Sequence, residues 1–405
     1  MLMLGGLVRA QTNTSAPAKT SGLNLPDLES LKVGGVRIGV PPVDVSNAGG
    51  GMPFGVSGQA NPVSEAGESQ RGEFVAAPVP SLSPTFGVGL AAGVGYIYRP
   101  SGDDTNSPPW VTGAGGFYSE NGTWAAGLGH KMNLAGDRWR LLGFAGYASV
   151  NYDFFGVGQE AGNNSRFVSL NQKVVGGLVE GLYRLSGRFY VGLRYSGSQV
   201  TTRYDGSSAP PAINNLLQGH QVDAHLSTLA LRAQWDTRDN SFNPSQGWFV
   251  DGEAAFCSEA LGSGFTYQTV SLTAKHYWSL SERQVVAFSA YGCFGFGDMP
   301  FFALSSFGAN NNLRGYSVGR YQDRMLLAGQ AEYRLQLTPR IGLVAFGGVG
   351  AVATDFDGFR SADPLPSGGV GFRYMIAPKN KVNFRLDLAW GKDSHAIYLG
   401  VGEAF

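Results

Sequence analysis

The sequence is poor in charged residues and in long hydrophobic runs. Only 15% of its 405 residues are charged, and 30 basic residues balance 30 acidic ones. Without an excess of positive charge, the sequence gives no electrostatic reason to expect nucleic-acid binding. The longest uncharged apolar run, Ile341 to Ala353, has thirteen residues and contains four glycines. A membrane-spanning helix needs about 18 apolar residues or more, so a helical membrane protein is excluded.

Cysteine and catalytic residue patterns are scarce as well. The two cysteines, Cys257 and Cys293, fall on candidate strands separated by another strand. Two strand spacings of about 4.8 Å exceed disulfide reach, so we expect free thiols. The histidines show neither the spacing of a metal site nor a paired nucleophile, and we predict no enzyme, no metal and no cofactor. These histidines are His130, His220, His225, His276 and His395.

Glycine and aromatic residues are abundant. The 60 glycines are roughly twice the average usage, but they lack the period of collagen. Aromatic residues make up 12% of the chain, too many for a disordered protein. An ordered, β-rich and weakly charged chain remains. Apart from helices, only closed barrels satisfy every backbone group inside lipid, so these features favour a transmembrane β-barrel.

From residue 84 onward, long segments alternate apolar and polar residues. In Met325 to Leu337, for example, Leu327 and Tyr333 share one parity and Glu332 and Arg334 share the other. This period of two indicates a two-faced strand. A soluble β-sandwich shows the same alternation. The segments are long enough for the nine to eleven residues of a tilted spanning strand, whereas soluble strands usually have about five or six, which favours the membrane barrel.

The expected strands number sixteen. Short and long connections alternate, as they do between the periplasmic and extracellular ends of bacterial barrels. The alternation requires one strand before residue 84, and Phe74 to Ser81 is the only candidate. We therefore predict an all-β, 16-stranded antiparallel transmembrane β-barrel over residues 74–405. The fifteen strands after the first are expected at 84–98, 109–119, 122–132, 137–152, 167–185, 187–203, 221–236, 246–257, 264–280, 283–296, 325–337, 340–353, 367–377, 380–391 and 394–405.

Two further features precede the barrel or begin it. Residues 1–10 are apolar and end like a cleavage site, which we interpret as the remnant of a signal peptide, and residues 11–73 are expected to form a disordered, flexible periplasmic tail. Pro78 and Pro80 share one parity, so they remove two backbone donors toward the same neighbouring strand. The first strand should therefore pair weakly with 394–405. It is either a short starter strand or one side of a seam that can part.

Three stretches carry a resemblance to a known family. They are Trp235 to Asn240 followed by Asn243 to Gly247, the segment Asn312-Leu-Arg-Gly-Tyr316 inside a long loop, and the terminal Phe405. In this order, residues 74–405 resemble the barrel of the BamA/TamA outer-membrane assembly superfamily, also called the bacterial surface antigen family.

The resemblance implies a loop that folds back into the barrel. Leu313, Arg314, Gly315 and Tyr316 would form its tip, with Arg314 paired to inward-facing Glu332 or Asp387. The family's usual aspartate after Phe346 is replaced here by Gly348, so one expected partner of the arginine is missing. The resemblance also makes Phe405 part of the seam and similar to the recognition signal of outer-membrane barrels. Asp236, Arg238 and Asp239 form either an ion-pair network at a periplasmic turn or a solvated turn.

Function follows from the resemblance as an expectation. It implies a bacterial outer-membrane protein that aids protein insertion, translocation or lipid movement through a lateral seam. Its expected partners are outer-membrane lipids, other outer-membrane proteins and periplasmic lipoproteins. Residues 11–72 are too few for the POTRA domains of assembly factors, so we expect a barrel without them. The alternative is a passive channel or a structural surface protein. Its water-filled lumen would then be lined by Arg188, Arg194, Arg334 and Arg385.

Overall fold

A computed structural model describes residues 32–33, 36–37, 73–99, 107–164, 166–204, 221–240, 242–300, 303–308, 312–377 and 381–405. The signal-peptide remnant expected at 1–10 lies outside these residues, and so does nearly all of the tail expected at 11–73. Within that tail, β1 (Lys32–Val33) and β2 (Val36–Arg37) form a short antiparallel pair.

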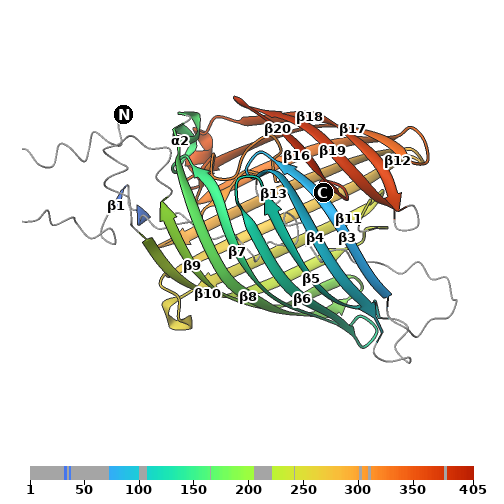
Figure 1. The fold of residues 1–405 in the computed structure, drawn as a ribbon, viewed down its shortest axis with the longest axis horizontal. Helices are drawn as coiled ribbons and strands as arrows, with labels where there is room; N and C mark the ends of the chain where they lie inside the picture. Colours follow the sequence, from blue (N-terminus) through green and yellow to red (C-terminus); the bar gives the residue numbers. More distant parts are fainter. Residues whose placement is uncertain are drawn as a thin grey trace, which may run out of the picture.

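Sixteen antiparallel strands close into a barrel, as the sequence predicted (Figure 1). Each strand pairs with the next one along the chain, and β20 pairs with β3 to close the circle. The strands are β3 (Glu73–Ser83), β4 (Gly87–Tyr98), β5 (Trp110–Ser119), β6 (Trp124–Leu134), β7 (Trp139–Phe154), β8 (Val168–Ser186), β9 (Phe189–Tyr204), β10 (Gln221–Asp236), β11 (Gly247–Cys257), β12 (Tyr267–Ser281), β13 (Gln284–Gly297), β16 (Met325–Gln336), β17 (Ile341–Ala353), β18 (Leu365–Ala377), β19 (Val382–Gly391) and β20 (Ser394–Val401).

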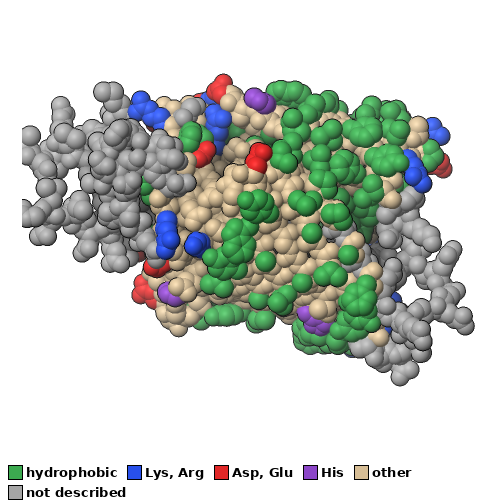
Figure 2. Space-filling model, in the orientation of Figure 1, with side chains coloured by type: hydrophobic (Ala, Val, Ile, Leu, Met, Phe, Trp, Pro, Cys, Tyr) green, Lys and Arg blue, Asp and Glu red, His purple; other side chains and the backbone are tan. Residues whose placement is uncertain are grey.

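The alternation along each strand separates an apolar outside from a polar inside. On β16, the outward Leu327 and Tyr333 are 42% and 39% exposed, whereas the inward Glu332 and Arg334 are buried. Figure 2 shows hydrophobic side chains spread over the visible wall, with most charged side chains toward its two ends. A soluble sandwich would hide its apolar face, so this arrangement fits a barrel surrounded by lipid. Cys257 and Cys293 are not joined in a disulfide, as expected, and both are buried.

The three longest connections, those after β7, β9 and β13, join strands at one end of the barrel, the loop end, and most short turns lie at the other, the turn end. The loop end carries α2 (Gln159–Asn163), η4 (Glu259–Leu261), η7 (Gly358–Arg360) and the two-residue strands β14 (Ser305–Ser306) and β15 (Gln322–Asp323). No helix among the described residues is long and apolar enough to cross a membrane.

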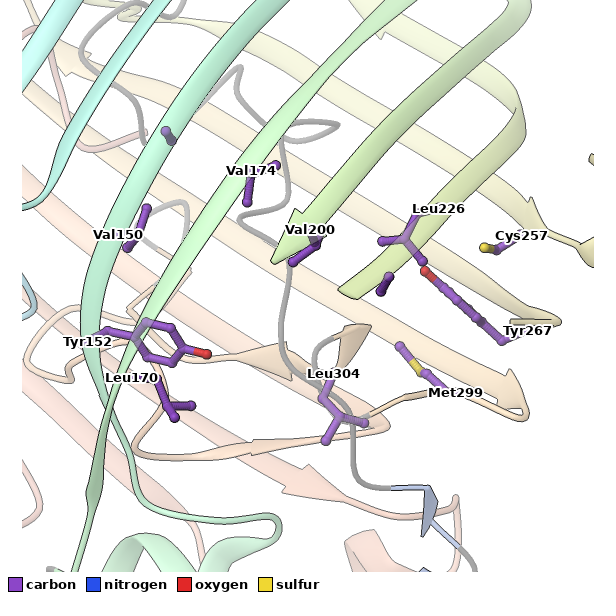
Figure 3. Close-up of a cluster of buried hydrophobic side chains, with 12 residues drawn as sticks. Val150, Tyr152, Leu170, Val174, Val200, Leu226, Cys257, Tyr267, Met299 and Leu304 are labelled. Atoms are coloured by element: carbon purple, nitrogen blue, oxygen red, sulfur yellow. The ribbon is translucent and has the colours of Figure 1, made fainter. Parts of the chain in front are cut away.

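Part of the interior is apolar, whereas the alternation in the sequence predicts a polar inner face. Near the loop end, side chains from β7 to β12 point inward and pack with two residues of the connection after β13 (Figure 3). Tyr152 is 7% exposed and Val200 only 1%. The inner wall is therefore apolar at the loop end, and its charged side chains lie nearer the turn end. The labelled members of this cluster are Val150, Tyr152, Leu170, Val174, Val200, Leu226, Cys257, Tyr267, Met299 and Leu304.

The final strand is shorter than predicted. It ends at Val401 instead of continuing to Phe405. Gly402 adopts a positive φ of 91° and turns the chain inward, so that residues 402–405 form an inward tail. The Glu403 side chain explains this turn, because it would face lipid if the strand continued, whereas inside it pairs with Arg373 at 2.8 Å. Phe405 consequently lies in the interior and not in the seam.

The seam between β20 and β3 is short. A single residue pair, Leu399 with Leu82, defines their register, whereas β3 pairs with β4 along its entire length. Extending the antiparallel register places Pro80 opposite Val401 and Pro78 opposite Glu403, where the chain has already turned inward. Among the described residues, the barrel is thus closed least firmly between its first and last strands.

Candidate functional site

The described residues of the connection between β13 and β16 (298–300, 303–308 and 312–324) fold into the interior and are called the plug loop. Its β14 and β15 segments pair with each other and form a narrow base. The side chains near the tip of the plug loop are completely buried, and they pack against apolar side chains of the wall. This cluster comprises Phe307, Leu313, Tyr316 and Tyr321 from the loop and Leu326, Ala328, Val352 and Leu365 from the wall.

Arg314 at the tip is held by two carboxylates. Its guanidinium lies 2.6 Å from Glu332 on β16 and 2.8 Å from Asp387 on β19, and all three side chains are 0% exposed. The Arg314 Nε also donates to Gln330 Oε1 at 3.2 Å. Ion pairs in such a dry site are strongly held only when their remaining polar atoms are satisfied, which these several partners achieve in part. The sequence leaves Glu332 and Asp387 as alternative partners of Arg314, and the structure brings both to the arginine.

The two residues after Arg314 fit the tip closely against the wall. Gly315 has a φ of 101°, and a Cβ atom there would approach the Gly391 nitrogen to 2.9 Å. Its backbone N–H donates to the Tyr398 hydroxyl at 2.8 Å. The Tyr316 hydroxyl donates to the Pro366 carbonyl at 2.5 Å and accepts from the Lys392 amide at 2.9 Å. The tip is therefore shaped for a residue without a side chain.

Gly348 stands where the family resemblance implies an aspartate, and Gln330 and the loop tip occupy the space that a side chain there would need. A Cβ atom at Gly348 would lie 2.7 Å from Gln330 and 3.1 Å from Leu313. A larger residue would thus displace both the tip and the glutamine that contacts Arg314. The neighbouring Phe346 places its ring 3.5 Å from the guanidinium carbon, a cation–π contact. Gln330 was missed in the sequence because an inward glutamine at a strand position carries no distinctive motif.

The carboxylates around Arg314 are shared with other arginines. Glu332 also pairs with Arg334 at 2.9 Å, and Asp387 also pairs with Arg373 at 2.5 Å. Arg334 in turn donates to the backbone oxygen of Phe405 at 2.7 Å. The plug loop, three strands of the wall (β16, β18 and β19) and the inward tail therefore meet in one network. Arg385 lies at its edge, 3.8 Å from Asp387.

The turn between β10 and β11 is a separate polar site at the turn end. Arg238 pairs with Asp236 at 2.8 Å, whereas Asp239 accepts hydrogen bonds from the hydroxyl and the amide of Ser245. Burial alone would raise the pKa of Asp239, but these hydrogen bonds hold it below its ordinary value. The site contacts the plug network through the Pro244 carbonyl, to which Arg334 donates at 3.4 Å, and through Tyr277, whose ring lies 5.6 Å from the Arg334 guanidinium carbon.

A second charged network lies on the wall formed by β8 to β11 and was not found in the sequence. Arg194 pairs with Glu180 and Glu253, and Arg232 pairs with Asp251 and Glu253. The cross-strand register decides these contacts, and sequence separation gives no indication of it. Within the described part of the chain, no group of three His, Cys, Asp or Glu side chains could hold a metal ion.

Residues 119–405 match the model of the Omp85 superfamily domain. The chain belongs to the Omp85 superfamily. The BamA/TamA resemblance is confirmed at this level, and the protein is an outer-membrane β-barrel. No curated protein sequence matches the chain.

Three solved structures share the fold. BamA from Haemophilus ducreyi lacking POTRA domains 1–3 has 13% sequence identity and a TM-score of 0.57, with 82% of this chain and 70% of that chain covered. CdiB from Escherichia coli has 10% identity and a TM-score of 0.56, with coverages of 84% and 63%. CdiB from Acinetobacter baumannii has 9% identity and a TM-score of 0.53, with coverages of 82% and 60%. The chain thus spans less than two thirds of the length of either CdiB protein. At these sequence identities, the similarity shows a shared fold alone.

Proposed function

We propose that this Omp85-superfamily barrel opens laterally between β3 and β20 to pass polypeptide segments into or across the outer membrane. The observation that supports this proposal is the seam itself, where one residue pair, Leu82 with Leu399, joins the two strands. By contrast, β19 and β20 pair throughout β20, from Ser394 to Val401.

Among the described strand pairs, β3 and β20 have the fewest paired residues to part. A backbone hydrogen bond contributes about 0.5–1.5 kcal/mol net, so parting one residue pair costs far less than parting any other neighbouring strands. Inside lipid, the freed backbone groups need new partners. An incoming extended segment supplies them by adding a strand to the open edge. The most suitable client is therefore an unfolded chain with alternating apolar residues, as in other outer-membrane proteins.

The proposal extends to partners but not to catalysis. Outer-membrane lipids surround the seam, and other outer-membrane proteins are the proposed clients. Periplasmic lipoproteins or chaperones are the proposed carriers that deliver them to the turn end. We assign no chemical reaction to the barrel; the charged groups around Arg314 and Arg194 form ion pairs that hold the plug loop and the wall together.

A disulfide across the seam tests this function. Leu82→Cys with Leu399→Cys places two cysteines at directly opposed positions, a geometry compatible with a disulfide. Cys257 and Cys293 are first replaced with serine. Insertion of a barrel protein into vesicles that contain the variant is then measured before and after reduction. We expect insertion to be blocked when oxidised and restored by reductant.

The matched control shares one of the two cysteines. Leu386 is opposite Leu399 within the β19–β20 pair, so Leu386→Cys with Leu399→Cys makes a disulfide that does not cross the seam. This variant should insert the client equally well when oxidised or reduced. Equal insertion by the oxidised and reduced seam variant would contradict lateral opening. A steady ion conductance unaffected by the seam disulfide would instead favour the passive channel.

A further inference from the structure

Arg385 on β19 is buried, but its ion pair is the weakest of the arginines that surround Asp387. Its Nε lies 3.8 Å from an Asp387 oxygen, and the residue is only 8% exposed. Arg314 and Arg373 pair with the same carboxylate at 2.8 Å and 2.5 Å, one on each oxygen. Both oxygens of Asp387 are therefore engaged at short distance by other arginines, which leaves Arg385 without a close partner of its own.

Several donor atoms beside Asp387 are unused. Within the described part of the chain, Nε and Nη1 of Arg385 are buried without a hydrogen-bond partner. Arg373 is directly opposite Arg385 on β18, and its Nη2 is also buried without a partner. Two neighbouring positive charges with unused donors are unfavourable in a buried site unless an anion compensates them. This pair of arginines therefore has the chemistry of an anion site.

The inner wall beside Arg385 leaves space for a small ligand. Gly400 is directly opposite Arg385 on β20. A Cβ atom at Gly400 would meet a single described atom within 4 Å, the Arg385 Nη2 at 3.7 Å. Extending the register of the seam places Ser81 of β3 opposite Gly400, and Ser81 faces the interior because it alternates with the exposed Pro80. Arg385, Gly400 and Ser81 thus border a niche whose centre carries no side chain.

We propose that Arg385 and Arg373 bind a phosphate group in this niche, with the Ser81 hydroxyl as a further donor. Guanidinium groups bind phosphate through paired N–H donors. The donors here stand on three strands, β18, β19 and β3, and a phosphate group offers them more oxygens than a carboxylate does. The occupant is either a free phosphate or the phosphate of a lipid headgroup, since both present the same oxygens. The site is independent of lateral opening and goes beyond the proposed function.

Thermal unfolding of the complete chain in detergent micelles measures the binding, because a ligand that binds only the folded protein raises the unfolding midpoint. Sodium phosphate is compared with sodium chloride at equal pH and ionic strength. We expect phosphate to raise the midpoint of the unmodified protein. Arg385→Gln should weaken the apparent phosphate affinity roughly ten- to hundredfold, because it removes a charge-assisted hydrogen bond. Arg360→Gln, at an 85% exposed side chain, should respond as the unmodified protein does.

Gly400→Asp supplies the anion from the chain itself. Gly400 does not have a positive φ, so the strand accepts other residues there. The new carboxylate would lie beside the Arg385 guanidinium, so it should raise the midpoint in chloride by several degrees and abolish the response to phosphate. Gly400→Asn is the matched control, because it has the same size without the charge and should not raise the midpoint in chloride.

A second probe separates the two sources of phosphate. Short-chain phosphatidic acid, added to the micelles, should raise the midpoint at a lower concentration than inorganic phosphate if the site takes a lipid headgroup. A response to inorganic phosphate alone would identify a free anion. Either result supports the site, provided that the response is lost in Arg385→Gln or in Gly400→Asp.

Three results would overturn the phosphate site. The first is an unmodified protein whose midpoint is the same in chloride and with either phosphate probe, since water alone then surrounds Arg385. The second is a phosphate response that persists in Gly400→Asp, because the ligand then lies elsewhere; this result is decisive even if Arg385→Gln does not fold. The third is equal stability of Gly400→Asp and Gly400→Asn in chloride, which would show that Arg385 does not lack a partner.

Discussion

Replacing Arg314 with alanine is expected to undock the plug loop. Removing one partner of a buried ion pair costs about 3–5 kcal/mol, because the remaining charge is left without compensation. Here Glu332 keeps Arg334 at 2.9 Å, and Asp387 keeps Arg373 at 2.5 Å. We therefore expect the lower limit, about 3 kcal/mol, which is roughly a hundredfold increase in the ratio of undocked to docked loop.

Conductance across a planar bilayer measures this change. The unmodified barrel should be nearly closed, since Leu313, Arg314 and Tyr316 are fully buried in its interior. Arg314→Ala should show frequent openings, and Arg314→Lys should fall between the two. Lysine keeps the positive charge but cannot form the forked contact with two carboxylates.

Two results would refute the reasoning. Arg360→Ala removes an ion pair with Asp357 whose side chains are 85% and 86% exposed, and it should leave conductance unchanged. If Arg314→Ala conducts like Arg360→Ala, the ion pairs do not hold the loop. A steady open pore in the unmodified protein would equally contradict a docked plug.

Three further changes test other parts of the site. Gly315→Ala should open the channel as Arg314→Ala does, because its Cβ atom would lie 2.9 Å from the Gly391 nitrogen at a φ of 101°; unchanged conductance would show that the loop tip can shift. Phe405→Ala should destabilise the barrel by about 3–5 kcal/mol through lost packing in the interior, as measured by thermal unfolding in detergent, and an unchanged midpoint would show that the inward tail is not packed. The pKa of Asp239 is lowered in the folded protein, so its hydrogen bonds to Ser245 stabilise the turn fully at pH values above the ordinary pKa of 3.8. This stabilisation is lost as the pH falls through the lower pKa of the folded state. Asp239→Asn should therefore flatten the acid limb of the unfolding profile, whereas an identical acid limb would exclude this contribution.

The barrel could be predicted from sequence because its signal is local. On β16, alternate residues such as Leu327 and Glu332 face lipid and interior, and this period can be counted along the chain. Strand number followed from the alternation of short and long connections. The predicted end of the last strand at Phe405 was wrong. Glu403 turns inward to pair with Arg373, which lies thirty residues away in the sequence, so no local pattern indicates this end.

The site was only partly accessible to the same reasoning. The family resemblance pointed to Arg314, Glu332 and Asp387, but the contact with Gln330 depends on where the loop tip comes to rest. The apolar inner wall near Val200 was missed because inward alternation was expected to be polar throughout. The contact between Val318 and Thr85 joins residues 233 apart in sequence, so no local pattern could have indicated it.

The inward tail has a consequence for delivery of the newly made chain. Phe405 is accessible to another protein only while the chain is unfolded, because in the finished barrel its side chain is 7% exposed and packs beside Tyr277. A carrier that grips this phenylalanine during transit must let go before the last turn can form. Release of Phe405 by the carrier and closure of the barrel would then occur together. A folded barrel would present no exposed Phe405 for the carrier to bind again.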